Sequence, residues 1–209
     1  MMSNDFDKVA PFYDRLAGAV FGKSIKKAQS EYLHLINPSS KILILGGGTG
    51  WILKEILDRQ STVEITYVEK STRMIELAKT ACPNQNIKFI NSSFEEWETE
   101  DNFDFIICNF FLDVFPSQKL KDQILPKIKS LIAENGELLV ADFQVNQPMW
   151  QKMLLWAMHR FFGLFSNMES QKLIDLNDLL ISNRLNEASA SYFFKGMIFS
   201  RVYEFEQQI

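Results

Sequence analysis

One stretch near position 45 restricts the folds open to this chain more than any other feature. Residues 42–45 form a short run of branched apolar side chains, followed at once by the glycines Gly46, Gly47, Gly48 and Gly50. An amphipathic pattern then covers residues 51–59, with one apolar stripe made of Ile52, Leu53, Ile56 and Leu57. Glycine permits positive φ and a close approach of the backbone to a ligand. A buried strand, a glycine turn and a helix in this order predict the first unit of an α/β fold.

The alternation of apolar runs and helical patterns continues along the chain. The expected strands are nearly uniformly apolar, as strands covered on both faces should be, and they span residues 41–45, 63–68, 87–90, 103–109 and 138–143. Two more, over residues 185–194 and 197–205, are joined at Lys195-Gly196, a plausible hairpin turn. The predicted fold is α/β: a Rossmann-like seven-stranded sheet, mostly parallel with a C-terminal antiparallel hairpin, and with helices on both faces.

Capping and turn residues predict where helices begin and end. Ser71 is a candidate N-cap for a helix over residues 72–81, and Ser117 for one over residues 117–132, in which Pro126 predicts a kink or break. Asn135-Gly136 predicts a turn into the next strand. Further helical patterns cover residues 147–165 and 176–183. Because no repeat or linker divides the chain, residues 1–209 are predicted to form a single domain.

Composition excludes several classes of partner. The chain is 46% hydrophobic and 23% charged with a net charge of −4, which offers the phosphates of nucleic acid no basic face. Its two cysteines, Cys82 and Cys108, lack metal-ligand spacing and are interpreted as reduced structural thiols, so no metal is expected. No secretory signal or apolar run of ~20 residues occurs, which predicts a cytoplasmic protein.

Two features at strand ends point to a nucleoside ligand. The glycines follow the spacing GxGxG, and Trp51 stands where the dinucleotide fingerprint has its third glycine, which disfavours a pyrophosphate. Glu69 ends the second expected strand, beside the glycine turn, where its carboxylate is placed to accept hydrogen bonds from ribose hydroxyls. Taken singly, each feature also has a structural reading, as a tight turn and as a solvated carboxylate at a helix start.

With these motifs the chain resembles the class I methyltransferases that use S-adenosylmethionine (SAM). Residues 9–16, read VAPFYDRL, with Phe21-Gly22 after them, look like the opening of the subgroup that contains the quinone-biosynthesis methyltransferases. The resemblance implies SAM as cofactor, S-adenosylhomocysteine (SAH) as product and methyl transfer to a small-molecule acceptor. It also implies N-terminal lid helices over residues 1–40 and a helical cap insertion over the acceptor site at residues 147–183.

The resemblance also implies roles for individual residues. The glycines of the turn would pass under the methionine and ribose parts of SAM, Glu69 would hold the ribose with Lys70 beside the adenine, and Tyr13 would be a lid residue. Ser93 and Phe94 match the loop that recognises the adenine edge, and Asn109 and Phe110 match the strand end near the reacting methyl. The predicted cofactor-binding residues are Tyr13, Gly46, Gly47, Gly48, Gly50, Glu69, Lys70, Ser93, Phe94, Asn109 and Phe110.

Two departures from the family pattern keep other functions open. Ile44 stands where the family often has an acidic residue, and Ser93 where it commonly has an aspartate. One alternative is therefore a protein that binds SAM or SAH without transferase activity. A nicotinamide-dependent oxidoreductase also uses a glycine turn and an acidic strand end, but Trp51 and the terminal hairpin disfavour it. An aminopropyltransferase would need several acidic residues to hold a polyamine, and residues 147–165 supply none.

The acceptor and any catalytic base are less defined. Residues 148–165 are rich in Trp, Met and Phe, which favours an apolar or aromatic acceptor, although the same residues suit simple cover of the sheet edge. A membrane-interface helix is the third reading, disfavoured by its few basic residues. Candidate bases are Asp113, Asp142, Tyr13 and His159, each of which also has a plain structural reading. The oligomeric state is not predicted.

Overall fold

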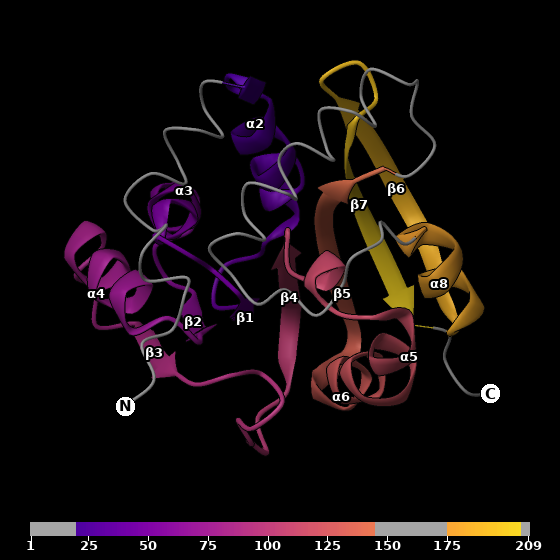
Figure 1. Ribbon diagram of the computed structural model, residues 1–209. Helices are drawn as coiled ribbons and strands as arrows, with labels where there is room; N and C mark the ends of the chain where they lie inside the picture. Colours follow the sequence, from indigo (N-terminus) through magenta and orange to yellow (C-terminus); the bar gives the residue numbers. More distant parts are fainter. Residues whose placement is uncertain (1–19, 145–174, 206–209) are drawn as a thin grey trace.

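A computed structural model of the chain, which describes residues 20–144 and 175–205, contains one seven-stranded sheet (Figure 1). The strand order is β3-β2-β1-β4-β5-β7-β6. Neighbours among the first five are parallel, and β7 runs antiparallel to both β5 and β6. This topology confirms the predicted fold class. The strands are β1 (Lys41–Leu45), β2 (Glu64–Glu69), β3 (Ile87–Asn91), β4 (Phe103–Asn109), β5 (Ile132–Phe143), β6 (Leu185–Phe193) and β7 (Ile198–Phe205).

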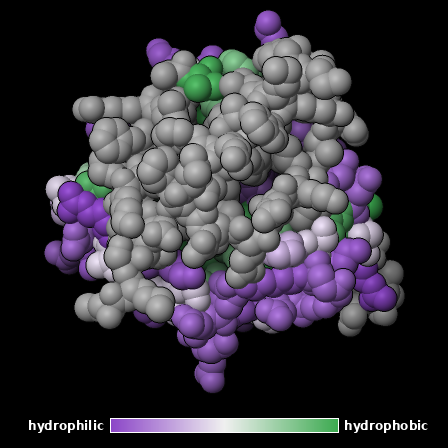
Figure 2. Space-filling model, viewed as in Figure 1, coloured by the Kyte–Doolittle hydropathy of each residue, from purple (hydrophilic) through white to green (hydrophobic). Residues whose placement is uncertain are grey.

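Helices cover both faces of the sheet. One face carries α2 (Ser24–Ser30), the 3₁₀ turn η1 (Leu33–Leu35), α3 (Trp51–Arg59) and α4 (Thr72–Ala81). The other carries the 3₁₀ turn η2 (Leu112–Val114), α5 (Ser117–Lys119), the π-helical turn η3 (Leu120–Ile124), α6 (Leu125–Leu131) and α8 (Leu176–Ser182). Hydrophilic side chains gather along the lower edge of the view in Figure 2, where α5 and α6 lie in Figure 1.

Each face of the sheet packs against its helices in an apolar core, because successive side chains of a strand point to opposite faces. In β1, Ile42 and Ile44 face α3 and α4, whereas Leu43 and Leu45 face α6 and α8. All four are at most 2% exposed, as expected for a strand covered on both faces. Each buried aliphatic side chain of this kind contributes about 1.5–3 kcal/mol to folding. No helix within the described ranges has the length and apolarity needed to cross a membrane.

Two of the three predicted start or break signals of the helices are confirmed. The Ser71 hydroxyl accepts a hydrogen bond from the Met74 amide at 3.2 Å and caps α4. The irregularity expected at Pro126 is the π-helical turn η3, directly before the proline, where the Leu125 amide donates to the Leu120 carbonyl. The prediction for Ser117 is wrong, because Pro116 holds the N-cap position and no side chain caps α5.

The structure also corrects the boundary between the last helix of this series and β5. The helix ends at Leu131 and β5 begins at Ile132, six residues before the predicted start. Asn135 has φ of +65°, and the pairing of β4 with β5 shifts register between Phe103 and Phe105. The predicted turn at Asn135-Gly136 is therefore an irregularity inside a longer strand. The predicted hairpin is present, with positive φ at Phe194, Lys195 and Gly196 between β6 and β7.

Candidate cofactor and acceptor site

A cavity of about 250 Å³ lies at the carboxyl ends of β1, β2 and β4, the edge where open α/β sheets bind ligands. It is lined by predicted cofactor residues from the ends of four strands, β1 to β4: Gly46, Gly47, Gly48, Glu69, Lys70, Ser93, Phe94, Asn109 and Phe110. Nine of the predicted residues thus meet in one place, although they are spread over 65 positions of the chain.

The turn formed by Gly46, Gly47 and Gly48 can adopt its conformation and lie close to neighbouring groups because glycine has no side chain. Gly46 and Gly48 have φ of +63° and +65°, values that disfavour any residue with a side chain. A Cβ on Gly47 would stand 2.2 Å from the Tyr67 ring, which is fully buried under the turn. A Cβ on Gly48 would meet nothing within 4 Å. The turn therefore presents bare backbone to the cavity and lies directly on the Tyr67 ring.

Glu69 is held in place by backbone amides. Its Oε2 accepts a hydrogen bond from the Gly48 amide at 3.1 Å, and its Oε1 accepts one from the Ser71 amide at 2.8 Å. On the same strand, the Tyr67 hydroxyl donates to the Gly48 carbonyl at 2.9 Å. Tyr67 and Glu69 of β2 thus both hydrogen-bond to the backbone of Gly48. The Glu69 carboxylate lines the cavity in a fixed orientation.

Gly50 has a different position from the other predicted cofactor residues. It does not line the cavity, and with φ of +80° it is the N-cap residue of α3. A Cβ there would stand 2.6 Å from the Ala78 Cβ of α4 and 2.8 Å from the Ala78 Cα. The structure therefore shows Gly50 as the residue that lets α3 and α4 pack closely at the start of the helix.

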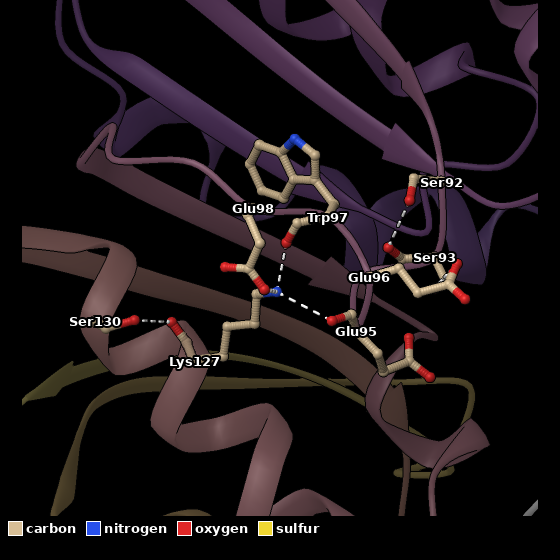
Figure 3. Close-up of polar contacts among 8 residues, drawn as sticks. All are labelled: Ser92, Ser93, Glu95, Glu96, Trp97, Glu98, Lys127 and Ser130. Carbon is tan, nitrogen blue, oxygen red and sulfur yellow. Dashed lines mark hydrogen bonds and ion pairs between the residues drawn. The ribbon is translucent and has the colours of Figure 1, made fainter.

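The loop after β3 lines the cavity with residues 92–95, and Figure 3 shows the polar contacts of this loop. Ser93 is 9% and Phe94 3% exposed, and the Ser93 hydroxyl donates to Glu96 Oε2 at 3.0 Å. The Trp97 amide donates to the Ser93 carbonyl, which closes the loop into a turn. Glu95 also lines the cavity and forms an ion pair of 3.0 Å with Lys119. Although burial raises its pKa, a backbone hydrogen bond and Lys119 outweigh burial, so the net shift of the Glu95 pKa is downward.

The end of β4 carries backbone strain. Phe110 has φ of +53°, an uncommon value for a bulky residue, and its amide donates to the Ala141 carbonyl of β5 at 2.8 Å. Its ring lies 5.0 Å from that of Phe143. Strained residues persist where surrounding structure holds them, and they cluster at functional sites. The strain coincides with the position where the sequence predicts the reacting methyl group.

Two candidate bases, Asp113 of η2 and Asp142 of β5, form an acidic pair beside the cavity, and neither of them lines it. Asp142 is fully buried, and one of its oxygens accepts a hydrogen bond from the Phe143 amide at 2.8 Å. Neither Asp113 Oδ1 nor Asp142 Oδ2 has a hydrogen-bond partner among the described residues. Burial raises the pKa of Asp113 to about 6, and burial together with the neighbouring Asp113 charge raises the pKa of Asp142 well above its usual value.

Several predictions fall on residues outside the described ranges. These are Tyr13, His159, residues 1–19 of the lid predicted at residues 1–40 and residues 147–174 of the cap predicted at residues 147–183. Ile44, which replaces the family's frequent acidic residue, is 2% exposed within the core between the sheet and α3.

Sequence reasoning missed part of the cavity wall. Its further lining residues include Gln29, Trp51, Met74, Phe111 and Phe115. Trp51 was considered only for its place in the glycine motif, yet its Nε1 donates to Gln29 Oε1 of α2 at 2.9 Å. The run Asn109-Phe110-Phe111 could have indicated Phe111, because it directly follows a predicted strand end; Gln29 carries no comparable signal.

No cluster suited to a metal is present in the part of the chain that the structure describes, where no three His, Cys, Asp or Glu residues converge. Both cysteines lie in that part and neither forms a disulfide. Cys108 is fully buried on β4, where burial raises the pKa of its thiol strongly. Burial is also the main cause that raises the pKa of Cys82.

Comparisons with known proteins agree with this geometry. Residues 42–136 match a family model described as a methyltransferase domain. A malonyl-[acyl-carrier protein] O-methyltransferase of Anoxybacillus flavithermus is 29% identical over 143 residues, which cover 68% of this chain and 52% of that protein. Polyamine aminopropyltransferase 1 of Streptomyces coelicolor is 26% identical over 137 residues, or 59% of this chain and 25% of that protein.

Among solved structures, a DhpI–SAH complex superimposes with a TM-score of 0.71 at 15% identity, covering 97% of this chain and 94% of that one. The chain spans about half the length of the malonyl-carrier relative and a quarter of the aminopropyltransferase. The fold and the glycine turn resemble those of class I SAM-dependent methyltransferases, and the match over residues 42–136 to a methyltransferase domain agrees with the resemblance found in the sequence. The comparisons do not single out the quinone-biosynthesis subgroup.

Proposed function

We propose that this chain binds SAM in the cavity at the carboxyl ends of β1, β2 and β4 and transfers its methyl group to a small acceptor. The observation that supports this most directly is the convergence of the bare glycine turn and the fixed Glu69 carboxylate on one cavity. The open space over Gly48 fits a ligand lying on the backbone, and a carboxylate is a natural acceptor for two ribose hydroxyls. Ser93 and Phe94 would face the adenine, and Asn109 and Phe110 the methionyl end.

The chemistry asks little of the protein beyond alignment. Bound SAM supplies a methyl group on a positively charged sulfur, an activated leaving group, so proximity and orientation provide most of the rate enhancement. Asn109 and Phe110, fixed by the bond from the Phe110 amide to the Ala141 carbonyl, would orient the reacting groups. For an acceptor that loses a proton, the sequence offers Asp113 as a base, but Asp113 does not line the cavity and its Oδ1 is buried, so alignment is the role that the described residues support.

An apolar or aromatic acceptor is supported by the cavity wall. Besides Phe94 and Phe110, which are assigned to the cofactor, three aromatic side chains line it, from Trp51, Phe111 and Phe115. Flat rings pack well against aromatic ligands, with ring centroids 4.5–7 Å apart in typical pairs. The malonyl-carrier relative is named for O-methylation of a carrier-bound acid. An acceptor panel should therefore contain small phenols and aromatic amines together with malonyl-acyl carrier protein.

The cofactor is tested by calorimetric titration of SAM and SAH into the wild type and Glu69→Ala. Loss of hydrogen bonds to a charged carboxylate should weaken binding by about 1.5–3 kcal/mol, or roughly 10- to 150-fold. Glu64→Ala, an exposed glutamate at the start of the same strand, is the matched control and should bind like the wild type. Failure of the wild type to bind either ligand would overturn the proposal.

The three alternative functions predict different experimental results. A protein that only binds the cofactor would give tight SAH binding and no methylated product with any acceptor of the panel. An aminopropyltransferase would bind decarboxylated SAM in preference to SAM, because its cofactor lacks the methionyl carboxylate. A nicotinamide-dependent oxidoreductase would show a rise in melting temperature with NAD or NADP and none with SAM.

A further inference from the structure

We propose that Lys127 is a positioning residue for the adenosine end of the proposed SAM site. Lys127 belongs to α6 and does not line the cavity, and no part of the family resemblance points to it. Its ammonium group lies against the loop after β3, which carries Ser93 and Phe94 (Figure 3). The inference rests on the proposed function, since it concerns how that site is held.

The contacts of Lys127 are with the backbone of the loop. Its Nζ donates to the Glu95 carbonyl at 3.3 Å and, in a shorter contact, to the Trp97 carbonyl. Its third contact is an ion pair of 2.9 Å with Glu98 Oε1. An ammonium has three N–H donors, so these contacts use its full capacity. One lysine therefore holds two carbonyls of the turn that begins at Ser93, one inside the turn and one at its last residue.

The contacts of Lys127 differ in burial, and therefore in how much they contribute to holding the loop. The Lys127 side chain is 17% exposed, whereas that of Glu98 is 83% exposed. An ion pair with so exposed a partner contributes little, because water screens it. The two carbonyl contacts are partly buried, and carbonyls deprived of a donor there would lose hydrogen bonds that water replaces poorly. The carbonyl contacts, more than the charge pair, hold the loop.

The same ammonium group also touches the cavity wall through an aromatic ring. Nζ lies 5.2 Å from the ring centroid of Phe94, within the range of a cation–π contact. The Phe94 ring packs edge-on against Phe111 at 6.1 Å, and Phe111 is the side chain that a Cβ on Gly46 would strike. Lys127 thus fixes both the backbone of the loop and the ring that this loop contributes to the cavity. Removing it should loosen the adenosine end and leave the β4 end unchanged.

The test compares Lys127→Met with Lys129→Ala, an exposed lysine two residues further along the same helix. Calorimetry would measure binding of SAH and of 5′-methylthioadenosine, which keeps the adenosine and lacks the amino-acid end. Lys127→Met should weaken both ligands by a similar factor, roughly tenfold. Lys129→Ala should match the wild type. A Lys127→Met protein that is folded and binds both ligands within twofold of the wild type would overturn the inference.

A second measurement separates positioning from general stability. In the ligand-free protein, amide hydrogen exchange of Lys127→Met should accelerate at residues 93–98 and stay unchanged in β1 and β4. Uniform acceleration across the sheet would mean that Lys127 only stabilises the fold, and would count against the inference. If the methionine variant does not fold, Lys127→Gln, which retains an N–H donor, is measured in its place. It should bind both ligands about threefold more weakly, and wild-type affinity would refute the proposal.

The outcome is distinguishable from failure of the proposed function itself. If wild-type protein does not bind SAH, the cofactor assignment fails and Lys127 is not at issue. If the wild type binds and Lys127→Met binds equally well, the cofactor assignment stands and only the role of Lys127 is lost.

Discussion

The two halves of the candidate site are built in opposite ways. At the ends of β1 and β2, polar groups are satisfied at short range: Glu69 accepts from the Gly48 and Ser71 amides, and Tyr67 donates to the Gly48 carbonyl. At the ends of β4 and β5, Asp113 and Asp142 each keep a buried oxygen without a partner among the described residues. The first half is preorganised for binding, whereas the second keeps unpartnered carboxyl oxygens beside the place where chemistry is proposed.

The cofactor half is therefore rigid, whereas in the acceptor half the burial of unpartnered carboxyl oxygens is energetically unfavourable. Buried polar atoms are normally hydrogen-bonded, so each exception in a native structure calls for an explanation. Here two of the exceptions are the neighbouring carboxyl groups of Asp113 and Asp142, which follow the strained Phe110 and end β5 respectively. Perturbed carboxyl groups of this kind occur in structural networks and at functional sites alike. The following predictions test whether the contrast between the halves is real.

The largest effect is expected from Gly47→Ala in the rigid half. A Cβ 2.2 Å from the Tyr67 ring must displace either a fully buried side chain or the turn itself. The substitution should lower the free energy of unfolding by ~3 kcal/mol and abolish measurable SAH binding. Chemical denaturation and calorimetry would measure the two effects. Gly196→Ala, with φ of +79° and nothing within 4 Å of the new Cβ, is the control and should cost only ~1 kcal/mol with SAH affinity intact.

If Gly47→Ala were tolerated with unchanged affinity, the turn would be adaptable and the cofactor half could not be called preorganised.

The second effect is a change in the pH dependence of stability in Asp113→Asn. The pKa of Asp113 is raised to about 6 in the folded state, so between pH 4 and pH 7 the folded protein binds more protons than the unfolded chain does. Stability from this group is fully present below the unfolded pKa and is lost as the pH rises through the folded value. Asparagine does not titrate. Between pH 4 and pH 7 the free energy of unfolding of the variant should therefore fall by roughly 2 kcal/mol less than that of the wild type.

Urea denaturation at pH 4, 5, 6 and 7 would measure this slope for both proteins. Asp122→Asn, at an exposed aspartate of η3, serves as control and should follow the wild-type curve. Identical slopes for Asp113→Asn and the wild type would show that the acidic pair does not titrate abnormally, and the contrast between the two halves would disappear.

The smallest effect is expected from Tyr67→Phe, which removes one hydroxyl from the rigid half. The bond to the Gly48 carbonyl should be worth about 1 kcal/mol of stability, and the turn should keep its shape because the ring remains. Thermal unfolding should show a small loss of stability, and SAH titration a small loss of affinity. A loss of affinity as great as that of Gly47→Ala would mean that this hydroxyl, and not the ring beneath the turn, determines the conformation of the glycines.

The sequence alone determined the order of the strands along the chain, the glycine turn and the position of Glu69 at the end of a strand. These are local properties: a buried strand needs an apolar run, a tight turn needs glycine, and Ser71 caps the residues next to it. Once the strands are parallel, their carboxyl ends meet at one edge, so residues as distant as Gly46 and Phe110 could be assigned to one cavity.

Tertiary structure alone decided the features that depend on contacts between distant segments. Asp113 and Asp142 were separate candidates until β4 and β5 brought their carboxylates together. Lys127 is an ordinary lysine in a helical pattern, and only the packing of α6 against the loop after β3 turns it toward two carbonyls. The periodicity of side chains encodes which face of an element is buried, whereas the partner that it meets there depends on the whole fold.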